Sequence, residues 1–180
     1  EFRALRGRRI SMIFQEPTTA LSPLHTIGNQ IGETLRIHTS LSKPEVQAQT
    51  EEMLELVGFP DPRRAFGTYP FELSGGLRQR AIIAMALICR PALLIADEPT
   101  TALDVTIQAQ ILQLLRDLQT KLNMAMLLIT HDLGVVANAA DEVSVLYQGE
   151  IVERGTPQKL FSAPEHPYTQ ALVKAAPRAL

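Results

Sequence analysis

Polar side chains that could act together in phosphate chemistry stand directly after three apolar runs of this sequence. Gln15 follows the first run, the acid pair Asp97-Glu98 ends the second, and His131 follows the third. One carboxylate can hold Mg²⁺ together with phosphate oxygens, and another can orient and deprotonate water. A glutamine can position that water, and a histidine can donate to charge developing on a phosphoryl group. The combination favours phosphoryl transfer, whereas the acid pair alone would also suit a helix cap or a surface.

A glycine pair offers a second place where a phosphate could bind. Leu73-Ser74-Gly75-Gly76 precedes a segment that predicts a helix up to Cys89. Glycine lets backbone N–H groups approach a ligand closely, and the N-terminus of a helix adds positive potential. The tetrapeptide alone is equally compatible with a turn and a helix cap. Its combination with the polar strand ends favours a phosphate contact.

The apolar runs predict the strands that must position these side chains. Buried strands are expected at residues 9–14, 93–96 and 126–129, and a segment of helical periodicity covers 107–122. Apolar strands that alternate with helices predict an α/β fold whose parallel sheet is covered on both faces. Ligands bind beyond the carboxyl ends of such strands. Three of the four strands expected in this sheet end in one of the polar groups, and this convergence predicts a site.

A helical zone and a hairpin complete the expected elements. Residues 22–90 favour helices, with a capping box at Ser42-Lys43-Pro44-Glu45 and a helix stop at Gly58. The pair Gln148-Gly149 lies between two apolar runs and predicts a β-hairpin.

Composition narrows the classes of function. The net charge of −2 and the pI near 6.1 argue against a dedicated nucleic-acid binder. Cys89 is the single cysteine, so an internal disulfide is excluded and a structural thiol is expected. The longest apolar run, from Ala81 to Cys89, is far shorter than the ~20 residues that span a bilayer. Any role at a membrane would therefore act through a partner.

The motifs resemble, in the same order, those of the ATP-binding subunits of ABC transporters. Gln15 matches the Q-loop, residues 73–80 the signature motif, 93–98 the Walker B strand, 101–104 the D-loop, and His131 the H-loop. The run 96–106 and the later His166-Pro167-Tyr168-Thr169 resemble the oligopeptide, dipeptide and glutathione importer subfamily. The resemblance implies a P-loop NTPase (RecA-like) parallel sheet, here incomplete, with an inserted ABC α-helical subdomain.

The resemblance also implies roles in ATP hydrolysis. Asp97 would hold Mg²⁺, and Glu98 would be the general base. Gln15 would contact Mg²⁺ and the attacking water, and His131 would touch the γ-phosphate. ATP and Mg²⁺ are the cofactors that these roles require.

Partners follow from the same resemblance. Ser74, Gly75 and Gly76 would bind ATP held by a second ATP-binding subunit, and Asp104 would lie across the dimer interface. Transmembrane permease subunits would be the other partners, with no nucleic acid. The location would be peripheral, at the cytoplasmic face of the bacterial inner membrane. The solute would be a peptide or a similar small molecule.

Nothing in the chain matches G-x-x-x-x-G-K-[ST], the loop that cradles phosphates. We therefore expect a C-terminal fragment of a larger ATPase, inactive when isolated. Its expected divisions are residues 1–21 and 91–155 for a partial RecA-like core, 22–90 for the helical subdomain with the signature motif, and 156–180 for an extension of the peptide-importer type. The alternative function is a soluble ABC-type ATPase of DNA repair or translation.

Apolar residues after Gln15 suggest a surface that docks a partner. Residues 17–31 include Leu21, Leu24, Ile27 and Ile31 on a connecting segment. We expect this segment to contact a permease. The simpler alternative is that these side chains pack a small helical core.

Overall fold

The computed structural model describes residues 5–15, 20–101 and 103–175. The chain forms two compact units, Glu1–Ile129 and Thr130–Leu180. The predicted divisions after residues 21, 90 and 155 stay predictions. An inserted subdomain that packs on its core forms one compact unit with it, so the two units do not test these divisions.

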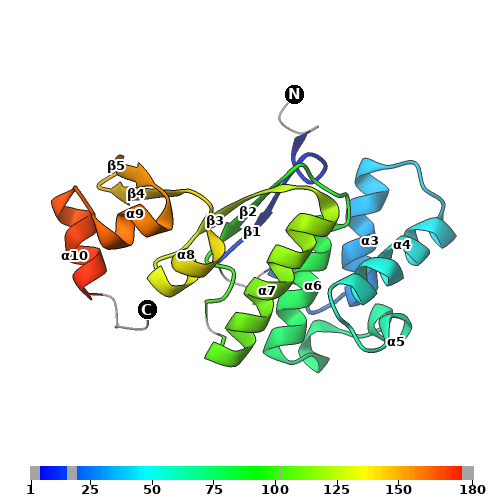
Figure 1. Cartoon of the computed structure of the whole chain (residues 1–180). Helices are drawn as coiled ribbons and strands as arrows, with labels where there is room; N and C mark the ends of the chain where they lie inside the picture. The colour runs from blue at the N-terminus through cyan, green and yellow to red at the C-terminus, as the bar shows by residue number, and fades with distance from the viewer. Residues whose placement is uncertain (1–4, 16–19, 102, 176–180) are drawn as a thin grey trace. The chain divides into compact units, whose positions relative to one another are not determined.

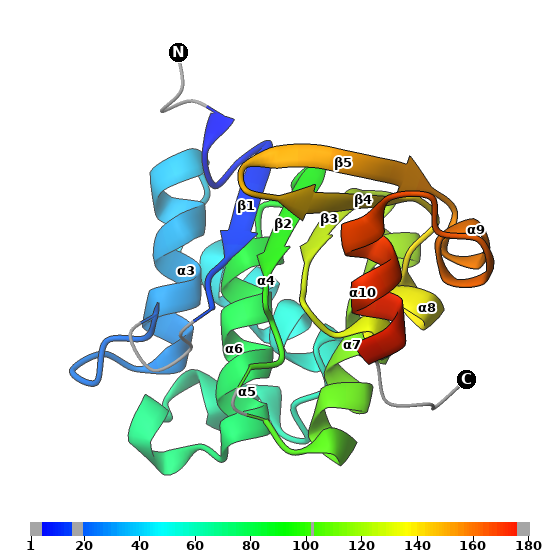
Figure 2. The same cartoon turned by 90° about the vertical axis from the view of Figure 1, so that its left-hand side faces the viewer.

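The first unit contains a parallel sheet. Its strands are β1 (Ile10–Ile13), β2 (Leu93–Asp97) and β3 (Ala125–Ile129), which lie side by side in that order (Figure 2). Ile13 pairs with Ala96, which in turn pairs with Leu128, so the three carboxyl ends lie at the same end of the sheet. The sequence predicted a fourth strand here. The sheet of the described residues has three, and the strands of the predicted hairpin pair with each other instead.

Helices fill the segments between these strands. They are α3 (Ile27–His38), α4 (Lys43–Leu56), α5 (Pro62–Phe66), the short 3-10 helix η1 (Pro70–Glu72), α6 (Gly75–Leu87) and, after β2, α7 (Val105–Leu122). The helix α4 begins with the predicted capping box, in which the N–H of Ser42 donates to Oε2 of Glu45 at 2.7 Å. Gly58 follows α4 at a φ of +85°, a conformation that glycine adopts without steric cost.

One apolar core joins the sheet to the helices. Ile111, Leu115 and Leu118 of α7, which lie in the segment of predicted helical periodicity, are all buried in it. Met53 and Leu54 of α4 are buried in the same core. Cys89, just after α6, is half-buried rather than fully buried, and this burial raises the pKa of its thiol. The thiol donates weakly to the carbonyl oxygen of Thr34 at 3.9 Å, which suits the structural role expected for it.

The two faces of the sheet differ. Ile13 and Leu94 are fully buried in the core that the sheet shares with α6 and α7, which lie together on one face (Figure 1). On the other face Met12, Leu127 and Ile129 are 38%, 52% and 45% exposed. The expectation of a sheet covered on both faces is therefore wrong for the described residues. Alternate side chains of a strand point to opposite faces, and the helices packed on this sheet cover only one.

The second unit is built around the predicted hairpin. β4 (Val143–Tyr147) and β5 (Glu150–Gly155) pair in antiparallel fashion, and Gln148 and Gly149 between them have φ angles of +49° and +84°. Positive φ at both central residues is the signature of a type I′ turn, which matches the twist of paired strands. The helices of this unit are α8 (Leu133–Ala139), α9 (Pro157–Ser162) and α10 (Pro167–Ala175).

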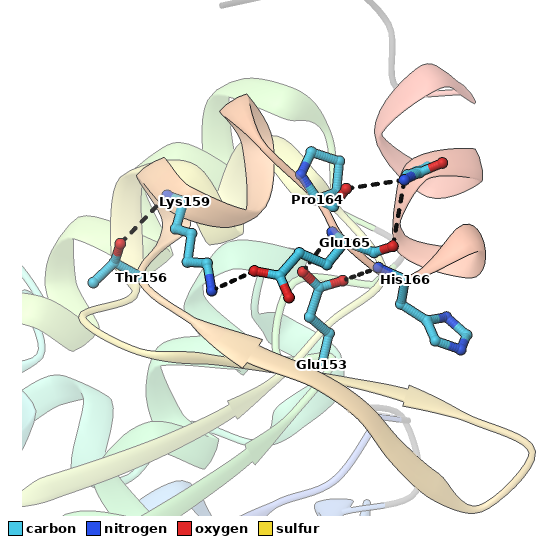
Figure 3. A network of polar contacts seen from close by, with 7 residues as sticks. Glu153, Thr156, Lys159, Pro164, Glu165 and His166 are labelled. Atoms are coloured by element: carbon cyan, nitrogen blue, oxygen red, sulfur yellow. Dashed lines mark hydrogen bonds and ion pairs between the residues drawn. The ribbon is translucent and has the colours of Figure 1, made fainter.

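Glu153 of β5 ties the start of α10 to the hairpin. Its carboxylate accepts the backbone N–H groups of Glu165 and His166 at 2.9 and 3.0 Å (Figure 3). These bonds, that of Glu165 foremost, hold the pKa of Glu153 below its usual range. Glu165 is itself paired with Lys159 of α9 at 2.8 Å. The strand and both helices are thus joined by one polar network.

The His166-Pro167-Tyr168-Thr169 segment packs within this unit. The ring of Tyr168 lies 4.1 Å from that of Tyr147 on β4, and Thr169 is buried. The N–H of Tyr168 donates to Nδ1 of His166 at 3.1 Å, at the beginning of α10. The motif that the sequence singled out therefore has a structural use, which is to fix α10 to the hairpin.

Candidate active site

Glu98 directly follows β2, and two side chains converge on its carboxylate. Oε2 accepts one hydrogen bond from Nε2 of Gln15 at 2.9 Å and another from Oγ1 of Thr101 at 2.8 Å. Gln15 stands two residues beyond Ile13, which pairs with Ala96, so the parallel register brings Gln15 level with Glu98. The structure therefore brings together two of the residues predicted for catalysis and fixes the orientation of the carboxylate.

The backbone of Glu98 has an unusual conformation. Its φ of +45° lies in the left-handed region, which costs a non-glycine residue roughly 1–2 kcal/mol. Two backbone bonds hold it there: its N–H donates to the carbonyl of Ile129 at 2.9 Å, and its carbonyl accepts from the N–H of Thr101 at 3.1 Å. Strain of this kind, held in place by its surroundings, is typical of functional positions.

Asp97 ends β2 and is half-buried, paired in register with Ile129. Among the described residues no group of three or more His, Cys, Asp or Glu side chains could hold a metal ion. Asp97 and Gln15 could offer a smaller set of side-chain oxygen donors. Mg²⁺ prefers such a set, because it keeps several waters and takes its other ligands from substrate phosphates. The residues present therefore fit a magnesium ion that is shared with a nucleotide.

The signature segment forms the start of α6. Ser74 is the N-cap, and its hydroxyl oxygen accepts the N–H of Leu77 at 3.3 Å. The first-turn N–H groups of a helix have no partner within the helix, and they can bind an anion. Ser74 and Gly75 are exposed, as a phosphate contact would require. The cap predicted as the simpler alternative is thus present, and it leaves the phosphate contact feasible.

Close packing explains why glycine stands at position 76. A Cβ atom at Gly76 would lie 3.1 Å from Cγ2 of Ile107, and one at Gly75 would lie 3.7 Å from a methyl of Leu103. Asp104 is the N-cap of α7, where its carboxylate accepts the N–H of Ile107 at 3.0 Å. The start of α6 therefore lies against the start of α7, and Ser74 and Asp104 cap neighbouring helices.

His131 and part of the predicted D-loop lie outside the described part of the first unit. His131 is an exposed residue of the second unit, just before Asp132, whose carboxylate caps α8. Its predicted contact with a phosphate stays a prediction. Ala102, in the middle of the predicted D-loop, lies outside the described residues.

Two residues of the site were missed by reasoning from the sequence. Thr101 stands three residues after Glu98, a spacing at which a turn lets a hydroxyl reach back to the carboxylate. Gln79 is a polar residue buried in α6, and it donates to the backbone of Pro99. The sequence feature that could have identified Gln79 is its position as a polar residue on the apolar side of a helix.

The expected docking surface needs correction. Leu21 is 5% exposed, and Ile27 and Ile31 are fully buried, so these residues pack the helical core. Leu24 is 80% exposed and remains available, whereas residues 17–19 lie outside the described part of the chain. The helical period of α3 places Ile27 and Ile31 on one side of the helix, facing α4 and α6.

A second exposed apolar segment is joined to the start of α3, which follows Leu24 in the chain. Tyr69 and Phe71 stack with ring centroids 5.6 Å apart, and Phe71 is 68% exposed. The N–H of Ile27 donates to the carbonyl of Thr68 at 2.8 Å, which joins this segment to the start of α3.

Across residues 5–15, 20–101 and 103–175, no helix has the length and hydropathy needed to cross a membrane.

Two family models match the chain. Residues 2–101 match the family described as ABC transporter. Residues 152–179 match the family described as oligopeptide/dipeptide transporter, C-terminal region. The second match covers β5 from Val152 onwards, the polar network of Glu153 and α10.

Similar curated proteins are named for import. A peptide import ATP-binding protein of Brucella ovis is 58% identical over 176 residues, which are 98% of this chain and 52% of that protein. The glutathione import ATP-binding protein GsiA of Escherichia coli is 55% identical over 178 residues, which are 99% of this chain and 29% of that protein. The chain thus spans about half, or less, of the length of these relatives.

Solved structures of similar fold are ATP-binding cassettes. The cassette MJ0796, a dimer bound to ADP and Pi, matches with a TM-score of 0.73 and 29% identity, over 86% of this chain and 66% of that one. Clostridium perfringens cbiO1, part of the transporter complex cbiONQ, matches with a TM-score of 0.76 and 26% identity, over 87% and 60% of the two chains. These likenesses support the parallel α/β fold predicted from the sequence.

Proposed function

This chain belongs to the ABC transporter family, and we propose that it supplies the hydrolytic residues and the signature helix of an ATPase that powers solute uptake. The cluster at Glu98 carries the proposal, because a carboxylate fixed by Gln15 and Thr101 lies one residue after Asp97 at the carboxyl end of a parallel sheet. The matched C-terminal region supports peptides or similar small molecules as the solute.

Glu98 acts as the general base in this proposal. Its carboxylate takes a proton from water as the water attacks the γ-phosphate of ATP, and ADP and phosphate leave. Gln15 and Thr101 donate to Oε2, so they restrict the carboxylate to one orientation. The side-chain oxygen of Gln15 is an acceptor suited to the attacking water or to magnesium. His131 would donate to the charge that develops on the phosphoryl oxygens.

Mg²⁺ would neutralise charge on the phosphates, with Asp97 and Gln15 as its protein ligands. Ser74, Gly75 and Gly76 would bind the phosphate of ATP held by a second copy of this subunit or by a related one. The exposure of Ser74 and Gly75 at the start of α6 supports this use. Asp104 would lie at the interface of the same pair, since it caps the helix next to α6. Each subunit would complete the site of the other.

The permease would bind near Leu24 and Phe71. Both side chains are largely exposed, and a hydrogen bond between Ile27 and Thr68 joins the two segments that carry them. Exposed apolar side chains gathered in this way are typical of protein contacts. Docking there would place the ATPase at the cytoplasmic face of the membrane. An ATPase of DNA repair or translation is less well supported, because the relatives are named for import.

Transport is the test of this function. The protein encoded by the complete reading frame would be reconstituted with its co-encoded permease in vesicles, and uptake of labelled di- to hexapeptides and of glutathione would be followed with ATP. We expect uptake that requires ATP and Mg²⁺ and that is lost in Glu98→Gln but kept in Glu55→Gln, an exposed acid of α4. ATP hydrolysis without uptake of any of these solutes would contradict the importer, whereas absence of hydrolysis would contradict the ATPase.

A further inference from the structure

Gln79 is a polar side chain enclosed in the core of the first unit. It is 2% exposed, and Ala81 to Ala84, which follow it on α6, are buried as well. Its Nε2 donates to the carbonyl oxygen of Pro99 at 2.6 Å. Its Oε1 is buried and has no hydrogen-bond partner among the described residues.

The hydrogen bond of Gln79 joins two segments that carry different parts of the proposed site. Gln79 lies in the second turn of α6, the helix that begins at Ser74. Pro99 directly follows Glu98, whose backbone is left-handed. The loop then runs through Thr101, which contacts the carboxylate of Glu98, and reaches the cap of α7. One side chain therefore connects the signature helix to the loop of the general base.

Packing alone does not explain why a glutamine stands at position 79. A buried acceptor without a partner destabilises the fold by at least as much as a typical hydrogen bond stabilises it. Methionine has a similar length and volume, and it would fill the same space without an unsatisfied oxygen. Burial alone would thus be served as well by an apolar side chain. What methionine cannot replace is the donor to Pro99.

We propose that Gln79 is a positioning residue that couples the signature helix to the Glu98 loop within one subunit. This proposal rests on the proposed function, in which Ser74 and Glu98 of one subunit serve two different nucleotides. A change at the nucleotide bound by Ser74 then reaches the base at the other nucleotide through α6, Gln79 and Pro99. Ile107 of α7 leaves little space for a Cβ atom at Gly76, so the two helices pack closely beside the same connection.

The test uses the protein encoded by the complete reading frame, in complex with its permease. Gln79→Met removes the donor at nearly constant volume, and Gln79→Asn keeps the amide but is one methylene too short to reach. Met85→Leu, at a half-buried position of the same helix, controls for changes in packing. Thermal unfolding, the KM for ATP, kcat and the Hill coefficient of hydrolysis would be measured for each variant.

For Gln79→Met we expect thermal stability equal to or above that of the wild type, an unchanged KM for ATP, and a kcat lowered by roughly 10- to 100-fold, the effect of a misplaced catalytic group. The Hill coefficient should fall towards one, and Gln79→Asn should show the same kinetic defects. A folded Gln79 variant with normal kcat and cooperativity would overturn the proposal. If both variants fail to fold, Gln79 is a structural residue and the positioning role is overturned as well. In either case loss of activity in Glu98→Gln would leave the proposed function standing.

Discussion

Nε2 of Gln15 donates a 2.9 Å hydrogen bond to Oε2 of Glu98, which links the segment after β1 to the residue after β2. The two residues are 83 positions apart in the sequence, and they meet because β1 and β2 are parallel neighbours. A movement of the segment after β1 therefore acts directly on the carboxylate of Glu98. That segment leads to Leu24, where we propose that the permease binds, so this hydrogen bond would connect docking to hydrolysis.

Thr101 makes the second bond to this carboxylate, and its removal should slow hydrolysis. Thr101→Val keeps the shape of the side chain but loses the 2.8 Å bond to Oε2 of Glu98. We expect kcat to fall about 10-fold, the lower end for a hydrogen bond to a charged group, while ATP affinity is kept. Thr100→Val is the matched control at the neighbouring position and should retain kcat. Equal kcat values for the two variants would remove Thr101 from the site.

Crosslinking in membranes tests the revised docking surface. A photoreactive residue at Leu24 or at Phe71, which are 80% and 68% exposed, should crosslink to the permease. Gln148 in the exposed turn of the hairpin is the negative control. Leu21 and Ile27 are unsuitable probes, because both are buried in the core. A crosslink from Gln148 but from neither Leu24 nor Phe71 would show that the permease binds elsewhere.

The attachment of α10 to the hairpin should weaken in acid. Hydrogen bonds from the N–H groups of Glu165 and His166 lower the pKa of Glu153 in the folded state. The carboxylate therefore stabilises the fold above its unfolded pKa of ~4.3, and this contribution is lost as the pH falls through the lower folded value. The protection factors of amides 165 and 166, which correct for the intrinsic pH dependence of exchange, would be measured from pH 7 down to 3 and should fall only at the acid end.

Substitution of Glu153 checks the same network at neutral pH. In Glu153→Gln the amide can accept only through one oxygen, so exchange of the two N–H groups should rise by on the order of fivefold, the usual worth of a helix cap. Glu150→Gln on the same strand takes no part in this network and should leave the exchange unchanged. Equal rates in both variants would show that Glu153 does not hold α10.

The sequence allowed the strands, the helices and Glu98 to be predicted because each left a local pattern. Apolar runs end at Asp97, and the helical period of α7 continues over 18 residues. The uncovered face of the sheet could not be predicted in this way, because an unbroken apolar run is typical of a strand buried on both faces, and here the residues on the exposed face are apolar as well. Ile27 and Ile31 were likewise ambiguous, because an apolar residue of a helix can pack in the core or contact a partner.

Thr101 and Gln79 were missed for a different reason. Each acts through a contact formed only when the loop after Glu98 folds, and a threonine in a turn or a glutamine in a helix is ordinary by itself. The signature serine illustrates the opposite case. A cap and a phosphate contact require the same residue at the same helix terminus, so the pattern at Ser74 predicted both and could not separate them.

The isolated 180-residue chain should not turn over ATP. It lacks the G-x-x-x-x-G-K-[ST] loop, which supplies most of the direct contacts to phosphate in such enzymes. Release of phosphate from ATP by the purified chain should stay at the level of a Glu98→Gln control. Steady Mg²⁺-dependent hydrolysis that copurifies with the chain and is lost in that control would contradict this expectation.

The most direct measurement compares ATP binding with ATP turnover for Glu98→Gln in the protein encoded by the complete reading frame. Glutamine retains the size of the side chain and an acceptor for Gln15 and Thr101, but it cannot take a proton from water. We predict unchanged ATP affinity and a kcat lowered by ~10²–10⁴, the usual worth of a positioned general base. A kcat close to that of the wild type would show that Glu98 is not the base and that the site has been wrongly assigned.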